Sequence, residues 1–186
     1  SLGLVGSEMC IRDSRNVARE DALIPLSAHG VALVSAGSLF PPDSALIWRG
    51  PILVNTLRQM LFDVAWPALD VLVVDLPPGT GDVALTLAQQ VDLTGAIVVT
   101  TPQDISLIDT RRALDLFDRL EVPVLGVVEN MSTHVCSACG HEEAIFKTGG
   151  GAALAEATGI EFLGALPLDG ALCEGGDAGA PFVLED

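Results

Sequence analysis

Short apolar runs alternate with segments of helical spacing along most of the chain. The strand-like runs lie within residues 31–36, 72–74, 97–99, 122–132 and 161–169. Runs of this length with little polar alternation are typical of strands that are buried on both faces of a parallel sheet. Because helical segments separate them, we expect parallel βαβ units and therefore an α/β fold.

The segments between these runs predict helices from their spacing and start signals. Helices are expected to begin near Pro51, at Asp82, at Asp104 or Ser106, and within the glycine-rich segment 147–159, where Gly159 is the expected stop. The proline-containing segment 40–44 is expected to be a loop. Residues 174–186 are expected to be loop-like, apart from a short apolar patch at 182–184.

The stretch DVLVVDLPPGTGD, residues 70–82, combines several features of a nucleotide site. Asp75 follows the apolar run and is expected at the carboxyl end of that strand, where open α/β sheets place their ligands. The loop after it is rich in proline and glycine, so backbone N–H groups can approach a ligand closely. The pattern indicates the Mg²⁺ side of a nucleotide site. The alternative is an ordinary strand–turn–helix with an exposed aspartate.

Charge and composition exclude several classes of protein. The 186 residues include 9 basic and 25 acidic side chains, and the formal net charge is −16. Such a chain lacks the basic clusters that bind nucleic acid, and it is not suited to an anionic membrane surface. No apolar run approaches the roughly 20 residues of a membrane helix. Four cysteines, two of them in a CxxC, favour intracellular metal or redox chemistry over a disulfide framework.

The first twenty residues fit poorly with the rest of the chain. They show no sustained period and no evident buried element. We therefore interpret residues 1–20 as a non-native leader, exclude them from the predicted fold, and place the domain at residues 21–186. Cys10 lies in this segment and receives no role.

The CxxC pair, Cys136 and Cys139, lies in a polar segment that is expected to form an exposed loop or small knuckle. Two thiolates are half of a metal or cluster site. His134 and His141 could complete a zinc site within the loop, although ligands this close in sequence would strain a tetrahedron. Alternatively, a second copy of the chain supplies two more thiolates across a two-fold axis. A redox pair or two idle thiols remain a third interpretation.

A phosphate cradle of the form GxxxxGK followed by Ser or Thr is absent from the sequence, whose one lysine is Lys147. The TGGG segment at 148–151 lies at an expected helix N-terminus, where it could hold an anion. Without a lysine that reaches the phosphate, a tight turn is the favoured interpretation of this segment.

From about Asp21 to its C-terminus, the chain resembles the Mrp-type iron–sulfur cluster carrier ATPases, which are P-loop proteins related to the MinD and ParA group. The resemblance rests on the segments SAGSLFPPDSALIWRGP, VVDLPPGTGDVALTLAQ, TTPQD, VLGVVENMS, CSAC, the GGG turn, and LPLD followed by EGGDAGAPFV. They cover nearly all of the chain after residue 20, in the family's order. The implied fold is the MinD-like α/β P-loop NTPase fold with a parallel sheet.

The resemblance implies a nucleotide site for ATP and Mg²⁺. Asp75 is similar to the Walker B acid that holds Mg²⁺ through water, and Gly79 to the switch glycine whose N–H senses the γ-phosphate. Asn130 is similar to the residue that hydrogen-bonds adenine. Pro167 and Asp169 match the turn that borders the base.

The resemblance also implies a cluster site and its partners. Cys136 and Cys139 match the pair that holds a bridging 4Fe-4S cluster between two subunits of a homodimer. The implied work is to accept a cluster in the cytoplasm and to pass it to apo-proteins, with ATP binding and slow hydrolysis altering the carrier. No nucleic-acid or membrane partner is expected.

The chain departs from the family at its N-terminal end. The family's domain begins with a strand and a glycine-rich P-loop carrying lysines, and this sequence has neither before residue 31. We therefore expect an N-terminally truncated domain that lacks its P-loop strand and does not hydrolyse ATP by itself. The alternatives are a partitioning or cell-division ATPase and a zinc-knuckle scaffold without nucleotide.

Overall fold

The computed structural model describes residues 2–6, 18–19, 22–35, 50–76 and 81–184. The chain divides into two compact units. The first comprises residues 1–87 and 176–180, and the second comprises residues 88–175 and 181–186. Each unit contains its own parallel strand pairs.

The first unit contains a four-stranded sheet with the order β4-β5-β1-β6. Its strands are β1 (Leu2–Gly6), β4 (Leu26–Ala28), β5 (Val31–Ser35) and β6 (Val71–Val74). β1 pairs in parallel with β5 and β6, whereas β4 and β5 form an antiparallel hairpin. A smaller antiparallel pair is formed by β2 (Ala18–Arg19) and β3 (Ala22–Leu23).

Helix α2 (Gly50–Phe62) supplies the core of the first unit. Met60 on this helix packs with Val34 of β5 and with Val64, and all three side chains are buried. The helix has Pro51 as its second residue, a position where the missing N–H of proline has no intrahelical partner to lose. The predicted strand at 31–36 and the predicted helix near Pro51 are confirmed.

Strand β1 lies within residues 1–20, the segment that the sequence led us to exclude from the predicted fold. Leu2–Gly6 is paired along its whole length with β5, and four of its residues are also paired with β6. Parallel partners are distant in sequence, and a five-residue apolar run gives no periodic signal, so the sequence alone did not reveal this strand. The assignment of residues 1–20 as a non-native leader, with the domain at 21–186, stays a prediction.

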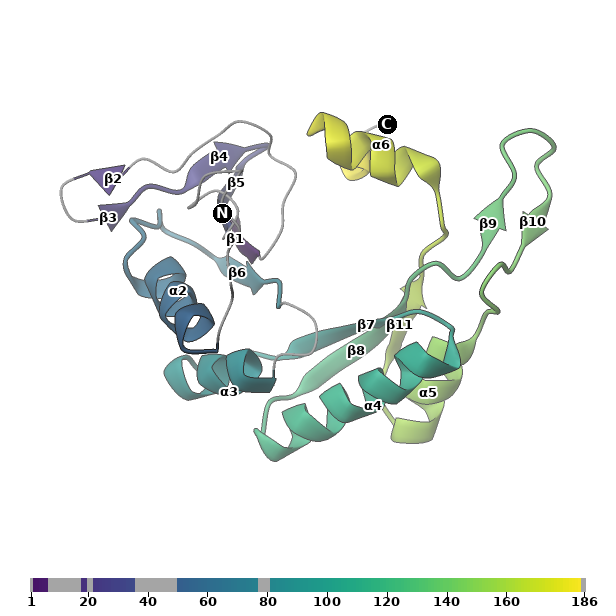
Figure 1. Ribbon diagram of the computed structural model, residues 1–186, viewed down its shortest axis with the longest axis horizontal. Helices are drawn as coiled ribbons and strands as arrows, with labels where there is room; N and C mark the ends of the chain where they lie inside the picture. Colours follow the sequence, from purple (N-terminus) through teal and green to yellow (C-terminus); the bar gives the residue numbers. More distant parts are fainter. Residues whose placement is uncertain (1, 7–17, 20–21, 36–49, 77–80, 185–186) are drawn as a thin grey trace. The chain divides into compact units, whose positions relative to one another are not determined.

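The second unit is built on three parallel strands in the order β11-β8-β7 (Figure 1). They are β7 (Ala96–Thr100), β8 (Val124–Glu129) and β11 (Phe162–Ala165). Helices α4 (Asp104–Arg119) and α5 (Gly150–Thr158) connect them. Val98 of β7 packs with Leu114 of α4 and Leu154 of α5, so both helices cover the same face of the sheet. The predicted α/β fold with a parallel sheet is confirmed.

The prediction that the apolar strands are buried on both faces is wrong for the described structure. In β7, Val98 is buried, whereas Ile97 and Val99 are 57% and 60% exposed. Successive residues of a strand point to opposite faces, and α4 and α5 pack on the face of Val98. In the first unit, Val71, Leu72 and Val73 of the edge strand β6 are also exposed.

Two helix predictions also need correction. Helix α3 (Gly81–Gln90) begins at Gly81, so Asp82 lies in its first turn and is not its N-cap. The tail expected to be loop-like contains helix α6 (Gly170–Ala178), followed by the 3₁₀ turn η1 (Phe182–Leu184). The three glycines and weak apolar spacing of α6 hid it in the sequence, because glycine is a poor helix former.

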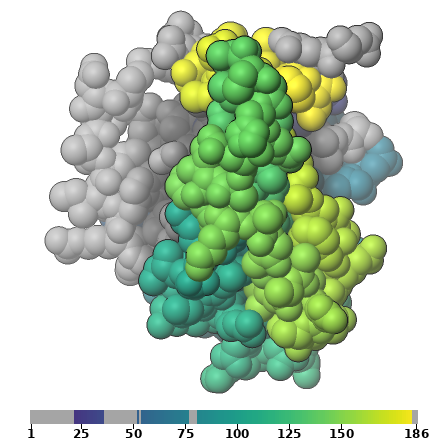
Figure 2. Space-filling view, turned by 90° about the vertical axis from the view of Figure 1, so that its right-hand side faces the viewer, coloured from purple at the N-terminus to yellow at the C-terminus, as the bar shows by residue number. Residues whose placement is uncertain are grey.

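A short antiparallel hairpin follows β8 and projects from the sheet of the second unit (Figure 1). It consists of β9 (His134–Val135) and β10 (Glu142–Glu143). In the space-filling view its residues, in green, lie at the surface that faces the viewer (Figure 2). We call residues 134–143 the cysteine arm. Across the part of the chain that the structure describes, no helix is long and apolar enough to cross a membrane.

Candidate functional site

Asn130 lies where β8 ends, at the carboxyl edge of the parallel sheet. Its backbone N–H donates to the Thr100 carbonyl at the end of β7, at 2.7 Å. Its side-chain Oδ1 accepts the N–H of Met131 at 3.0 Å. Met131 has a left-handed backbone with φ of 57°, so the chain turns sharply here. The Nδ2 donor of Asn130 has no partner among the described residues and is available to a ligand.

Glu129, the residue before Asn130, is a buried carboxylate that is 1% exposed. Its Oε1 accepts the N–H of Gly149 at 2.9 Å, and its Oε2 accepts the N–H of Gly151. Helix N-termini have unpaired N–H groups and a partial positive charge, so they favour an anion. Glu129 therefore ties the end of β8 to the first turn of α5.

The glycines at 149–151 fit this contact closely. Gly149 has a φ of 82°, a left-handed conformation that glycine adopts without a steric penalty. A Cβ at Gly150 would lie 2.9 Å from the Pro102 carbonyl oxygen, and a Cβ at Gly151 would lie 3.0 Å from the Glu129 Cβ. The interpretation of TGGG as a tight turn is confirmed, and the anion at this helix N-terminus is the chain's own carboxylate.

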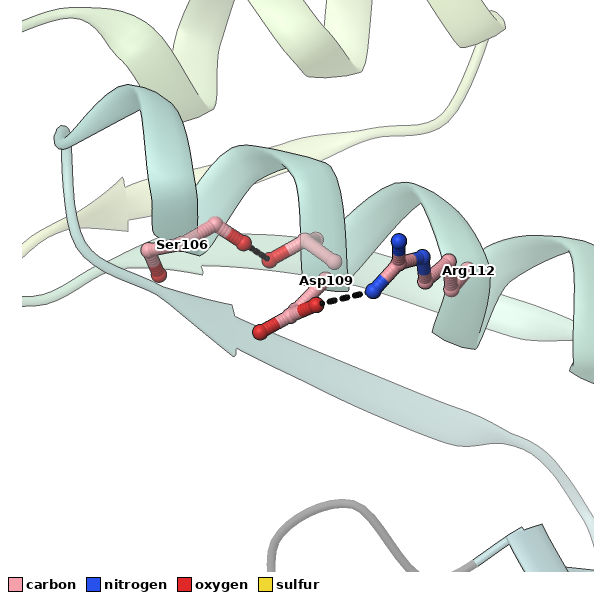
Figure 3. A network of polar contacts seen from close by, with 4 residues as sticks. Ser106, Asp109 and Arg112 are labelled. Carbon is pink, nitrogen blue, oxygen red and sulfur yellow. Dashed lines mark hydrogen bonds and ion pairs between the residues drawn. The ribbon is translucent and has the colours of Figure 1, made fainter.

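A hydroxyl cluster supports Thr100, to which Asn130 is bound. The Thr110 Oγ1 atom lies 2.8 Å from the Thr100 Oγ1 atom, and the Ser106 Oγ atom lies 3.0 Å from it. The Oγ atom of Ser106, which lies in the first turn of α4, also accepts the N–H of Thr101 at 3.0 Å. Figure 3 shows Ser106 with the Asp109–Arg112 ion pair of the same helix, whose two side chains are exposed. The cluster holds the start of α4 against the end of β7.

The turn after β11 lies beside the end of β8. The Leu166 N–H donates to the Glu129 carbonyl at 2.8 Å. Pro167 is exposed in this turn. Asp169 accepts the N–H of Ala171 through Oδ1 at 2.9 Å, so its carboxylate caps helix α6. The structure thus brings the predicted base-bordering turn next to the strand end that bears Asn130.

Cys136 and Cys139 lie in the loop between β9 and β10, and both are free thiols. The Cys136 N–H donates to the His141 carbonyl at 2.9 Å, and the Gly140 N–H donates to the Cys136 carbonyl at 2.8 Å. Gly140 has a φ of 69°, which lets the chain turn tightly after the second cysteine. The predicted knuckle around the CxxC pair is confirmed.

The surroundings of Cys136 favour its thiolate. The backbone N–H of Ala138, and then that of Cys139, are the largest causes that lower the pKa of the Cys136 thiol. The Cys139 side chain lowers this pKa further, burial opposes the shift, and nearby His134 adds the last and least lowering effect on the pKa. The thiolate is the form that binds metals, so this loop is chemically suited to a metal or cluster.

A complete metal site within the loop is not formed. Among the described residues, no group of three or more His, Cys, Asp or Glu side chains is placed to hold a metal ion. The His134 Nδ1–H instead donates to the Leu168 carbonyl at 3.0 Å. A zinc ion bound by Cys136, Cys139, His134 and His141 stays an alternative, because an Nδ1–H that donates to a carbonyl leaves the Nε2 lone pair of His134 free for a metal. Within the described residues, the arm of one chain offers two thiols, Cys136 and Cys139.

Asp75 directly follows β6 and is exposed. Its expected position at the carboxyl end of that strand is confirmed, and its role stays a prediction. It belongs to the first unit, whereas Asn130 and the cysteine pair belong to the second. Gly79 and the predicted loop at 40–44 lie outside the described residues.

Two residues that organise this region, Glu129 and Lys147, carry no local signal of their role. Glu129, within the predicted strand region 122–132, received no role, and its carboxylate bonds the first turn of α5. Lys147 forms an exposed ion pair with Asp104 at 2.9 Å, which links the segment after the arm to the start of α4. Both contacts join residues about 20 or 40 positions apart, so local spacing cannot predict them.

A family model described as the ParA, NUBPL iron-transfer P-loop NTPase matches residues 4–186. The chain belongs to this family of P-loop NTPases. The match confirms the resemblance to the Mrp-type carriers that the motifs indicated.

Curated relatives bear the name iron–sulfur cluster carrier protein. The one from Escherichia coli (strain K12) is 53% identical over 162 residues, which are 87% of this chain and 44% of that protein. The one from Deinococcus radiodurans is 51% identical over 172 residues, which are 92% of this chain and 49% of that protein. The chain therefore spans about half the length of the curated relatives it matches.

Solved structures share the fold. A nucleotide-binding protein from Archaeoglobus fulgidus, in complex with ADP and with cobalt, aligns with a TM-score of 0.79 and 28% identity, over 100% of this chain and 76% of that one. The septum site-determining protein MinD from Pyrococcus horikoshii, complexed with Mg-ADP, gives a TM-score of 0.62 at 17% identity, over 97% and 74% of the two chains. The MinD likeness concerns the fold alone.

Proposed function

We propose that the protein is an iron–sulfur cluster carrier that accepts a 4Fe-4S cluster and passes it to apo-proteins. The cysteine arm is the observation on which the proposal rests. It presents Cys136 and Cys139 as free thiols at the surface, with N–H groups that favour the Cys136 thiolate. Thiolates are the ligands of iron–sulfur clusters. The name of the curated relatives supports the same cargo.

We propose that the working carrier is a homodimer bridged by the cluster. A 4Fe-4S cluster takes four thiolates, and the described residues of one chain bring only two to the arm, with no third ligand beside them. A two-fold interface presents the same patch from both copies, so a second chain completes the set with no further residue type. Free cysteines fit a reducing compartment, and we propose the cytoplasm.

We propose that the longer protein to which this chain corresponds binds and slowly hydrolyses ATP. In this scheme the free Nδ2 donor of Asn130 bonds an adenine ring nitrogen, and the turn of Pro167 and Asp169 borders the base. Asp75 would hold Mg²⁺ through water, and the N–H of Gly79 would sense the γ-phosphate. Mg²⁺ would supply positive charge to the phosphates. The ADP bound by the Archaeoglobus protein supports a nucleotide at this fold.

The cluster assignment is tested by anaerobic reconstitution of the chain with iron and sulfide. Cys136→Ser and Cys139→Ser should each lose the cluster, because each removes a thiolate from a site that has none to spare. Cys173→Ser is the matched control, since Cys173 is also a free, exposed thiol but lies on α6. Iron and acid-labile sulfide are measured per chain. Full cluster content in either arm variant would contradict the proposal.

A further inference from the structure

A ladder of hydrogen bonds continues beyond the end of β11 toward the cysteine arm. The Ser132 N–H donates to the Leu166 carbonyl at 3.0 Å. Two residues further on, the Leu168 N–H donates to the Thr133 carbonyl at 2.7 Å. The segment 166–168 therefore lies alongside residues 132–133, between the end of β8 and the first residue of the arm.

His134 adds the next contact of this ladder through its side chain. Its Nδ1 lies 3.0 Å from the Leu168 carbonyl oxygen, which can only accept, so Nδ1 carries the proton. In the arm, His134 pairs with Glu143, and the next residue, Val135, pairs with Glu142. The ring thus joins the base of the hairpin to the segment 166–168.

His134 does not belong to a formed metal-binding group within the described residues. His141, the other histidine of the arm, contributes its backbone carbonyl to Cys136. Its side chain has no hydrogen-bond partner among the described residues. The two histidines that the sequence offered as equivalent zinc ligands therefore differ: within the described part of the chain, the His134 ring is hydrogen-bonded to the segment 166–168, and the His141 ring is not.

We propose that His134 is a positioning residue that orients the cysteine arm through its bond to the Leu168 carbonyl. The segment 166–168 also contacts Glu129, which precedes Asn130. One short segment therefore contacts both the proposed adenine site and the first residue of the cysteine arm. Loss of the bond leaves the two cysteines on a hairpin of two residue pairs, and isolated hairpins are marginal in water. The meaning of this contact for a bound cluster rests on the proposed function.

The test compares three variants of the 186-residue chain without metal. His134→Phe keeps a ring but removes the donor, His134→Asn keeps an N–H donor near the position of Nδ1, and His141→Phe is the matched control. Amide hydrogen exchange at Cys136 and Gly140, which are bonded within the arm, reports its order. Loss of one hydrogen bond of ordinary strength should make amide exchange in the arm about fivefold faster. His134→Phe should show this increase, whereas His134→Asn and His141→Phe should stay within about twofold of the unmodified chain.

The outcomes that overturn the proposal are equally specific. Unchanged exchange in His134→Phe would show that the bond does not order the arm. Equal increases in His134→Phe and His134→Asn would show that packing, and not the donor, is responsible. Amides of β8 serve as an internal control for the fold. In the unmodified chain, the ¹⁵N chemical shifts of the His134 ring should show a proton on Nδ1, and a ring with its proton on Nε2 alone would overturn the proposal without any variant.

A second readout separates this proposal from the proposed function. After reconstitution with iron and sulfide, His134→Phe should release iron to a chelator several-fold faster than the unmodified chain, and His134→Asn should not. Equal release from His134→Phe would contradict the inferred role in holding a cluster. If the unmodified chain binds no cluster, the proposed function fails, while the exchange and tautomer measurements still decide whether His134 positions the arm.

Discussion

The carboxylate of Glu129 accepts the N–H of Gly151, so the end of β8 is bonded directly to the first turn of α5. The same carboxylate accepts the N–H of Gly149 at 2.9 Å. Glu129 and Gly151 lie 22 positions apart in sequence. The contact fixes the strand end from which Asn130 and the cysteine arm emerge.

Removal of this carboxylate should destabilise the second unit. Glu129→Ala leaves two backbone N–H groups and a cavity in a buried position, and we expect the free energy of unfolding to fall by about 2–4 kcal/mol. Glu156→Ala is the matched control, because Glu156 is exposed on α5, the helix that Glu129 contacts, and it should change stability by less than about 0.5 kcal/mol. Amide hydrogen exchange of α5 gives the measurement. Trp66 lies in the first unit, so its fluorescence should respond less. Equal protection in the two variants would contradict this account of Glu129.

The pKa of Cys136 predicts a pH dependence for alkylation. Its folded-state pKa is lowered, chiefly by the Ala138 N–H, so the folded chain holds more thiolate than the unfolded chain below the ordinary pKa of a thiol. The associated stability is present above the unfolded pKa and is lost as the pH falls through the folded pKa. Peptide-resolved mass spectrometry after iodoacetamide treatment should give a lower midpoint pH for Cys136 in native buffer than in urea. Coincident midpoints, or a higher one in native buffer, would refute the assignment.

The 186-residue chain should not hydrolyse ATP measurably. Its sequence contains no GxxxxGK followed by Ser or Thr, and that loop supplies the N–H groups and the lysine that neutralise the phosphates. Phosphate release in the presence of Mg²⁺ is the measurement. Turnover that persists through purification and disappears in Asp75→Ala would show that the chain contains a complete catalytic site.

The sequence predicted the elements of the second unit well because their signals are local. Apolar runs located β7 and β8, and Gly159 was correctly expected to end α5, where it has a φ of 70°. The knuckle around the cysteines also followed from its polar composition and CxxC spacing. Signals of this kind depend on residues within a few positions of one another.

The contacts that organise the site could not be predicted because they are long-range. The bond between Glu129 and Gly151 and the bond between His134 and Leu168 each depend on a chain crossover that the local spacing of residue types does not specify. Strand β1 was missed for the same reason, since its partners β5 and β6 follow much later in the sequence. Helix α6 escaped for a different reason, because its glycines weaken every local helical signal.

The central claim is that each chain provides half of a cluster site. Its most direct test is the mass of the chain before and after anaerobic loading with iron and sulfide, measured together with the iron content. The account predicts that loading converts monomers to dimers with about two iron atoms per chain, that is, one 4Fe-4S cluster per two chains. A loaded monomer, whether it holds a four-iron cluster or a single zinc ion, would contradict it.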